Sequence, residues 1–191
     1  MTTIIAYVLI ASFFILEGRL RQGHEAKTLE TTEADRGSTR RIGAAFGTCI
    51  LLMVVAPILN ALSIGKITWH PTLLGWSGVV LVILCLALRV WAARVLGAYY
   101  TRTLRVSSDQ HIVQQGPYRL IRHPGYLADI FLWIGGGLAV LNWIVLIVML
   151  VIVPYAYIYR VRTEEAMLAQ AFGDEFTAYR AKTWRLIPLI Y

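Results

Sequence analysis

The longest apolar run of the chain is residues 126–159, YLADIFLWIGGGLAVLNWIVLIVMLVIVPYAYIY, in which Asp129 is the one charged residue. As a single helix its 34 residues would be about 50 Å long, whereas the hydrocarbon core of a bilayer is about 30 Å thick. One crossing is therefore excluded. The three glycines at 135–137 and the pair Asn142-Trp143 are places to bend, so the stretch predicts two short spans, 126–141 and 143–159, joined as a tight helical hairpin.

The rest of the chain is also too apolar for a water-exposed surface. Charged residues make up 15% of the 191 residues and apolar residues 58%, whereas a soluble domain has about 25% charged residues. Apolar runs at 3–16, 42–64 and 71–88 predict three earlier spans, the third of which reaches residue 96 if Arg89 and Arg94 snorkel. We expect an all-α integral membrane protein with about five transmembrane helices. It forms a single membrane domain, 1–191, with three spans in 1–96 and a core in 97–191.

The basic residues predict the orientation in the bilayer. Seventeen of the 18 Lys and Arg residues lie beside or after the first, third and fifth spans, and only Lys66 lies on the other side. By the positive-inside rule the N-terminus is outside, and the C-terminus is in the cytoplasm. The basic residues alternate with apolar runs, so a nucleic-acid partner is not expected. Cys49 and Cys85 stand in apolar runs outside any Cys/His cluster, so no metal site is expected.

A proline-bearing turn at residues 116–126, GPYRLIRHPGY, is the strongest local signal for a site. Pro124 disfavours helical angles at His123 and suits the first position of the next helix. Irregular backbone leaves N–H and C=O groups free for a polar ligand, and in lipid it is tolerated only inside protein or a water-filled cavity. The alternative is a simple interfacial turn, with Tyr118, Tyr126 and Arg122 as headgroup anchors.

Two further signals lie in the hairpin. Arg160 and Glu164 are spaced i, i+4 on one helical face, at the cytoplasmic end of the fifth span. The alternative is a surface ion pair worth less than about 1 kcal/mol. Asp129 is an acid inside the fourth span, and such a residue is a functional-site candidate. The alternative for Asp129 is a hydrogen bond to Arg122 or Tyr118.

Together these sequence motifs occur in an order that is typical of a known protein family. From about residue 97 to 188 the chain resembles the isoprenylcysteine carboxyl methyltransferase family, part of a group of small membrane methyltransferases that includes phospholipid methyltransferases. The resemblance is carried by Ile112-Val113-x-x-Gly116-Pro117-Tyr118, Arg122-His123-Pro124-Gly125-Tyr126, Glu164-Glu165 and Phe172-Gly173-Asp174-Glu175-Phe176-x-x-Tyr179. The order and spacing of the pieces are more specific than any single piece.

The resemblance implies that the cofactor is S-adenosylmethionine, bound by residues of the turn and of the last span. The implied cofactor-binding residues are Gln110, His111, Ile112, Val113, Tyr118, His123, Pro124, Gly125, Tyr126 and Glu164. Arg160 falls on the family's substrate-contacting arginine, so Arg160 and Glu164 are the implied catalytic residues. Two positions depart from the family pattern. Gln110 stands where a histidine is usual, with His111 one place later, and Ala128 replaces a common glycine.

The implied reaction is methyl transfer to the carboxylate of an isoprenylcysteine-like or other lipophilic acceptor, with membrane lipid as surroundings. Arg160 would hold the carboxylate, Glu164 would bind positive groups of the cofactor, and aromatic faces would favour the sulfonium. One alternative is N- or S-methylation of a lipid or small molecule, with Asp129, Glu165 or His123 as the base. Another class is a non-catalytic ligand-binding or transport protein, whose charges serve topology alone.

Overall fold

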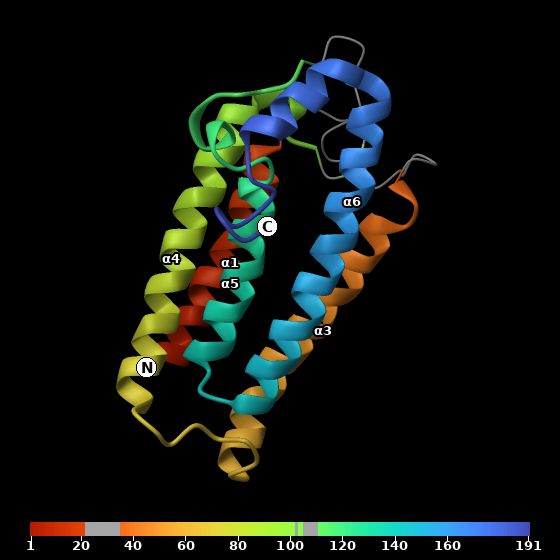
Figure 1. The fold of residues 1–191 in the computed structure, drawn as a ribbon. Helices are drawn as coiled ribbons and strands as arrows, with labels where there is room; N and C mark the ends of the chain where they lie inside the picture. Colours follow the sequence, from red (N-terminus) through yellow and green to blue (C-terminus); the bar gives the residue numbers. More distant parts are fainter. Residues whose placement is uncertain (22–34, 102, 105–110) are drawn as a thin grey trace.

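A computed structural model describes residues 1–21, 35–101, 103–104 and 111–191, and the helices in these ranges run nearly side by side (Figure 1). They are α1 (Thr2–Leu20), α3 (Ser38–Ala61), α4 (Pro71–Leu96), α5 (Pro124–Ala139) and α6 (Trp143–Lys182), with 3-10 turns η2 (Gly97–Tyr99) and η3 (Gly116–Arg119). Within the described ranges the only β pairing is two isolated bridges. The expected all-helical class is confirmed.

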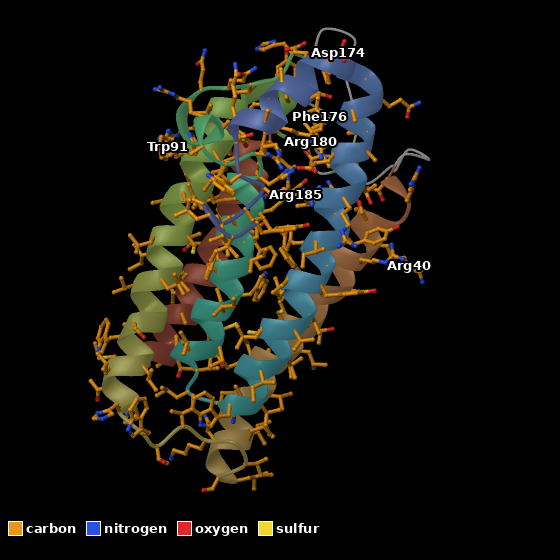
Figure 2. All side chains as sticks on the ribbon, in the orientation of Figure 1. Arg40, Trp91, Asp174, Phe176, Arg180 and Arg185 are labelled. Carbon is orange, nitrogen blue, oxygen red and sulfur yellow. The ribbon has the colours of Figure 1, made fainter. Side chains whose placement is uncertain are left out.

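The helices are suited to a membrane. Four of them, α1, α3, α4 and α6, are long and apolar enough to cross one. Large apolar side chains such as Ile4, Val54, Leu73 and Val151 are exposed, and side chains project outward along the shafts of the helices (Figure 2). α5 has 16 residues, just below the length of about 17 that a crossing needs. The integral membrane fold is confirmed, and the fifth crossing stays a prediction.

The hairpin between α5 and α6 turns at Val140, Leu141 and Asn142, with Leu141 in the left-handed region at φ 58°. The Asn142 side chain caps α6, because its Oδ1 accepts from the backbone N–H groups of Ile144 (3.1 Å) and Val145 (3.3 Å). Its Nδ2 donates to the Ile64 carbonyl at 2.9 Å. The predicted tight hairpin is present, and Asn142 ties it to the loop after α3.

The glycines at 135–137 do not bend the chain, contrary to our expectation; they lie inside α5. Their role is close packing. A Cβ atom placed on Gly78 of α4 would lie 2.5 Å from the carbonyl oxygen of Gly135. Small residues at such a contact let two helix backbones approach each other in a membrane. α1, α4 and α5 form one group, and α6 packs on α5 and α3 (Figure 1).

α6 is bent at Gly173, where φ is 51° and ψ is −117°. The sequence predicts that the helix ends here, and regular helical geometry does stop, but helical turns resume and continue to Lys182. A positive φ of this kind favours glycine. The turns after the bend lie back over the end of the bundle (Figure 1). They place the Tyr179 hydroxyl 2.8 Å from the Tyr118 carbonyl oxygen, to which it donates.

Candidate active site

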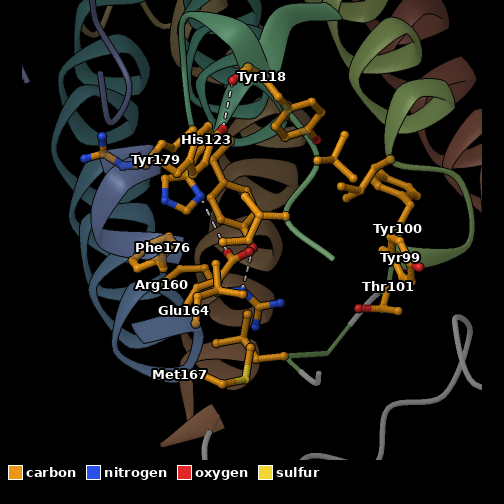
Figure 3. A pocket seen from close by; sticks show the side chains of 18 of the residues that line it. Tyr99, Tyr100, Thr101, Tyr118, His123, Arg160, Glu164, Met167, Phe176 and Tyr179 are labelled. Carbon is orange, nitrogen blue, oxygen red and sulfur yellow. Dashed lines mark hydrogen bonds and ion pairs between the residues drawn. The ribbon is translucent and has the colours of Figure 1, made fainter. Parts of the chain in front are cut away.

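An opening of about 980 Å³, partly open to solvent, lies where α4 ends, α5 begins and α6 bends. Figure 3 shows its walls: Tyr99, Tyr100 and Thr101 face His123, Arg160 and Glu164 across the space. The lining side chains come from four parts of the chain. They are Arg89, Leu96, Tyr99, Tyr100, Thr101, Thr103, Leu104, His111, Ile112, Val113, Tyr118, Arg122, His123, Gly125, Tyr126, Arg160, Glu164, Met167, Leu168, Phe172, Phe176 and Tyr179.

The hairpin brings the proline-bearing turn against α6, as the shared cofactor site implied by the resemblance requires. Arg122 Nε lies 2.8 Å from Glu165 Oε1, and His123 Nε2 lies 3.4 Å from the same oxygen. Glu165 Oε2 also contacts Arg185 Nη2 at 2.8 Å. Because the Arg122 side chain is buried in this cluster, the alternative of Arg122 as a headgroup anchor is wrong. Glu165 holds the turn, α6 and the following segment together.

The turn has the local geometry expected of a His-Pro pair. His123 precedes α5 at φ −125° and ψ 58°, and Pro124 is the first helical residue. The His123 ring stacks on the Tyr126 ring with 5.4 Å between centroids and 7° between planes. Glu164 of α6 contacts the other nitrogen of the His123 ring: its Oε2 lies 3.7 Å from His123 Nδ1. The side chain of Glu164 is 23% exposed, yet Oε2 is buried without a hydrogen-bond partner among the described residues.

Arg160 is buried, with 6% of its side chain exposed, so the alternative of a surface ion pair is wrong. Its Nη1 donates to Asp35 Oδ1 (3.0 Å), Ser38 Oγ (2.9 Å) and Thr39 Oγ1 (2.8 Å) at the start of α3. Its Nε donates to the Tyr126 hydroxyl at 3.1 Å. The guanidinium is thus fixed between the N-terminal half of the chain and the proline-bearing turn.

The environment of Asp35 keeps its carboxylate charged. Burial alone would raise the pKa of Asp35, but hydrogen bonds from Thr39 and Ser38 and the charge of Arg160 outweigh that effect and hold the pKa below its usual value. The carboxylate and the guanidinium therefore face each other as ions throughout the neutral pH range.

A second ion network lies deeper, and the sequence did not predict it. Arg89 of α4 donates to Glu17 of α1 (Nε to Oε1, 2.8 Å) and lies beside Asp129 of α5 (Nη1 to Oδ2, 3.1 Å). The Tyr157 hydroxyl donates to the same Asp129 oxygen at 2.5 Å. The alternative in which Asp129 accepts a hydrogen bond from Arg122 or Tyr118 is therefore wrong. Each contact joins different helices, so spacing along one helix gives no sign of it.

A second opening, of about 770 Å³, lies between α1 and α3 and reaches this network. One part of its lining is apolar: Phe13, Phe14, Ile42 and Phe46. The other part is polar: Glu17, Arg21, Thr39, Arg89, Thr101, Tyr126, Asp129, Tyr157 and Arg160. Tyr126, Arg160, Arg89 and Thr101 line both openings. Two separate spaces, one of them partly apolar, therefore meet at the same side chains.

Most residues of the expected site lie together. His111, Ile112, Val113, Tyr118, His123, Gly125, Tyr126, Arg160 and Glu164 line the first opening. Pro124 lies beside it as the first residue of α5, and Gln110 falls outside the described residues.

The first opening is also lined by residues for which the sequence predicts no role in the site, among them Tyr99, Tyr100, Thr101, Met167 and Phe176. Tyr100 is buried, and its hydroxyl donates to Glu17 Oε1 at 2.5 Å. Phe176 does belong to the Phe172–Tyr179 motif, and that motif was the available signal. Nothing in the local pattern marked the other four.

Comparisons with known proteins agree with the resemblance. The sequence model of the isoprenylcysteine carboxyl methyltransferase (ICMT) family matches residues 78–170. The probable protein-S-isoprenylcysteine O-methyltransferase of Oryza sativa subsp. indica is 30% identical over 60% of this chain and 61% of its own length. The protein-S-isoprenylcysteine O-methyltransferase of Saccharomyces cerevisiae is 30% identical over 74% of this chain and 59% of its own length.

A solved structure shares the fold. The eukaryotic intramembrane Ras methyltransferase ICMT superposes with a TM-score of 0.60 at 24% identity, over 81% of this chain and 53% of the other. The chain thus spans about three fifths of the length of the curated relatives it matches. The residues matched by the family model include both halves of the hairpin, and the resemblance seen in the sequence is confirmed.

Proposed function

On the premise that this chain is related to the isoprenylcysteine carboxyl methyltransferase family, we propose that it is a membrane methyltransferase. The cofactor is S-adenosylmethionine, and the acceptor is the carboxylate of an isoprenylcysteine-like lipophilic molecule. The observation that carries the proposal is the meeting of two openings at Arg160 and Tyr126. A polar cofactor and a lipid-tailed acceptor need separate entrances and a common point of contact.

The first opening has residues that fit the cofactor. S-adenosylmethionine supplies an activated methyl group on a positively charged sulfonium. Glu164 Oε2, a buried oxygen without a hydrogen-bond partner among the described residues, is a suitable acceptor for its positive groups. The Tyr118 and Tyr126 rings offer faces that attract cations. Residues 111–113 form a further part of the wall.

The second opening fits the acceptor. The rings of Phe13, Phe14 and Phe46 suit a hydrocarbon tail. Moving a tail from lipid into this space gains little, because the tail was already out of water. The head group therefore decides which acceptor is used, and Arg160 lies at that end. A carboxylate is ionised at neutral pH, so it needs no base; the residues have to align it with the methyl carbon.

The basic residues support the proposed orientation. Arg40, Arg180 and Arg185 all lie toward the end of the bundle that carries the first opening (Figure 2). By the positive-inside rule that end faces the cytoplasm. The water-soluble cofactor would then enter from the cytoplasm, and the acceptor would arrive from the bilayer.

The decisive experiment measures transfer of a radiolabelled methyl group from S-adenosylmethionine by the full chain in nanodiscs. The acceptors are a prenylcysteine carboxylate, a lipid amine and a lipophilic thiol. We expect label in the carboxylate acceptor, released by mild base as expected for a methyl ester. Arg160→Ala should lower kcat/KM for that acceptor by at least about 100-fold, the scale of a lost charge-assisted contact. Cofactor affinity should stay unchanged.

Arg162→Ala is the matched control, because Arg162 lies two residues away on the same helix and is exposed. It should transfer methyl groups like the unmodified chain. Label in the amine or thiol alone would replace the proposal with N- or S-methylation. No label in any acceptor, together with no binding of S-adenosylmethionine, would overturn it.

A further inference from the structure

Three exposed arginines gather at the start of α3. They are Arg36, Arg40 and Arg41, and Arg40 projects away from the bundle (Figure 2). Within the described parts of the chain, none of the three forms an ion pair with an acid. Asp35, the acid next to them, is paired with Arg160. This arginine cluster therefore carries three positive charges that no described acid balances.

Tyr159 of α6 holds part of the arginine cluster in place. The Arg41 guanidinium carbon lies 3.7 Å from the centroid of the Tyr159 ring, in a cation–π contact. The Tyr159 hydroxyl donates to the Arg36 carbonyl oxygen at 2.9 Å, and Arg41 Nη1 donates to the same oxygen at 3.3 Å. A guanidinium has five N–H donors, and Arg41 uses one of them among the described residues. The others are available to an anion such as phosphate, which arginine binds well.

The exposed surface that continues from Tyr159 along the bundle is apolar. Tyr155 and Val151 lie one and two turns before Tyr159 on the same face of α6, and both are exposed. α3, which packs on α6, exposes Leu51 and Val54 along its shaft. A molecule bound here would meet arginines with one end and apolar side chains with the rest of its length, as a phospholipid does.

We propose that the arginine cluster and Tyr159 bind the headgroup of an anionic phospholipid from the cytoplasmic leaflet. The phosphate accepts hydrogen bonds from the arginines, and the acyl chains lie along the exposed apolar side chains of α3 and α6. Charge complementarity selects the lipid. A zwitterionic phospholipid brings a cation of its own, which the arginines repel. Each basic residue near an anionic membrane surface contributes about fivefold in affinity, so three of them favour an anionic lipid strongly.

The same lipid has a route to the candidate active site. Two pairs of neighbouring residues join the turn before α3 to α6. Asp35 accepts from Arg160 inside the protein at 3.0 Å, and the carbonyl of Arg36 accepts from Tyr159 at the surface. A headgroup that fixes Arg36 also steadies the Asp35 carboxylate that orients Arg160. This link to catalysis rests on the proposed function, whereas the binding of the lipid does not.

Native mass spectrometry tests the binding. The full chain is released from nanodiscs that hold equal amounts of phosphatidylglycerol and phosphatidylcholine with the same acyl chains, and the retained lipids are counted. We expect phosphatidylglycerol to be retained in preference. Arg41→Gln should lower its affinity about fivefold, and R36Q, R40Q and R41Q together about 100-fold. Arg94→Gln is the matched control and should leave the affinity unchanged, because Arg94 is an exposed residue of the last turn of α4 and removes the same charge.

Photolabelling tests the location. A phosphatidylglycerol with a photoactivatable headgroup should label residues 36–41 and 155–159. Labelling elsewhere, equal retention of the two lipids, or an equal effect of Arg94→Gln and Arg41→Gln would overturn the lipid site. Displacement of the lipid by an excess of soluble glycerol 3-phosphate would assign the arginine cluster to a free anion instead.

Methyl transfer in nanodiscs with and without phosphatidylglycerol tests the link to catalysis. We expect the lipid to raise kcat/KM for the acceptor about fivefold, the lower end of typical coupling between two sites, and to leave the Kd of S-adenosylmethionine unchanged. Arg41→Gln should remove this difference, and Arg94→Gln should keep it. Binding of the lipid without an effect on kcat/KM would overturn the link alone. Methyl transfer in no nanodisc would overturn the proposed function and the link, while retention and labelling still decide the lipid site.

Discussion

Asp35 Oδ1, in the turn before α3, accepts a hydrogen bond from Nη1 of Arg160 on α6 at 3.0 Å. The two residues are 125 positions apart. The arginine expected to hold the acceptor is therefore oriented by a part of the chain that carries no recognisable motif.

Replacing Asp35 by Ala should release the Arg160 guanidinium from α3. We expect kcat/KM for the acceptor to fall by about 10- to 100-fold, because a positioned charge is lost, with no change in the Kd of S-adenosylmethionine. Isothermal calorimetry and the methyl-transfer assay measure the two quantities. Asp35→Asn, which keeps the shape and one acceptor oxygen, should restore part of the loss. Equal weakening of cofactor and acceptor binding would contradict a positioning role.

With a carboxylate acceptor, kcat/KM should not change with pH in the neutral range. With an amine acceptor, it should rise with pH. The pKa of Asp35 is lowered in the folded chain, so its contribution to stability is fully present above the unfolded value of about 3.9. It is lost as the pH falls through the lower, folded pKa. With a carboxylate acceptor, kcat/KM should thus be level between about pH 5.5 and 7.5. An ascending limb in this range would point to an acceptor that must lose a proton.

Glu164→Gln should weaken the binding of the cofactor without unfolding the chain. Oε2 has no hydrogen-bond partner among the described residues, and its contact with His123 Nδ1 is long, at 3.7 Å. We expect the Kd of S-adenosylmethionine to rise by about 10-fold or more, as expected when a charge-assisted contact is lost. Thermal unfolding without ligand should be unchanged. An unchanged Kd would remove Glu164 from the cofactor site.

Glu165→Ala, unlike Glu164→Gln, should lower the stability of the folded chain. It leaves Arg122, His123 and Arg185 without their common carboxylate. Removing one partner of a buried ion pair costs about 3–5 kcal/mol, so the temperature of unfolding should drop by several degrees in a nanodisc. A variant as stable as the unmodified chain would show that Glu165 does not hold the turn to α6.

Gly78→Ala should disturb the contact between α4 and α5. The new Cβ would lie 2.5 Å from a backbone oxygen of Gly135, and overpacking of this kind costs about 1–3 kcal/mol. Gly47→Ala in α3 is the control, since nothing lies within 4 Å of the added atom. Thermal unfolding of both variants gives the comparison. Equal stability would mean that the two helices separate at no cost.

Local constraints explain what the sequence could predict. Pro124 restricts His123, and an apolar run too long for one helix must turn, so the proline-bearing turn and the hairpin were both predictable. The juxtaposition of His123 and Glu164 followed from the hairpin alone. The glycines were misread because a glycine at a bend and a glycine at a helix contact look the same in a sequence.

Contacts between helices explain what the sequence could not predict. Asp129 pairs with Arg89 and Tyr157, and Tyr100 pairs with Glu17, so each pair depends on how separate helices pack. The partners of Arg160 at the start of α3 are of the same kind. No spacing along one helix encodes such pairs.

The segment after α6 has a consequence for biosynthesis. The Arg122 N–H donates to the Trp184 carbonyl at 2.8 Å, the Trp184 N–H donates to the Leu120 carbonyl at 2.9 Å, and Arg185 contacts Glu165. A ribosome makes these partners some sixty positions after the turn to which they bind. A nascent chain can therefore insert all its apolar helices while the site is still unfinished. The proposed methyl transfer would then begin only after residues 184 and 185 have emerged.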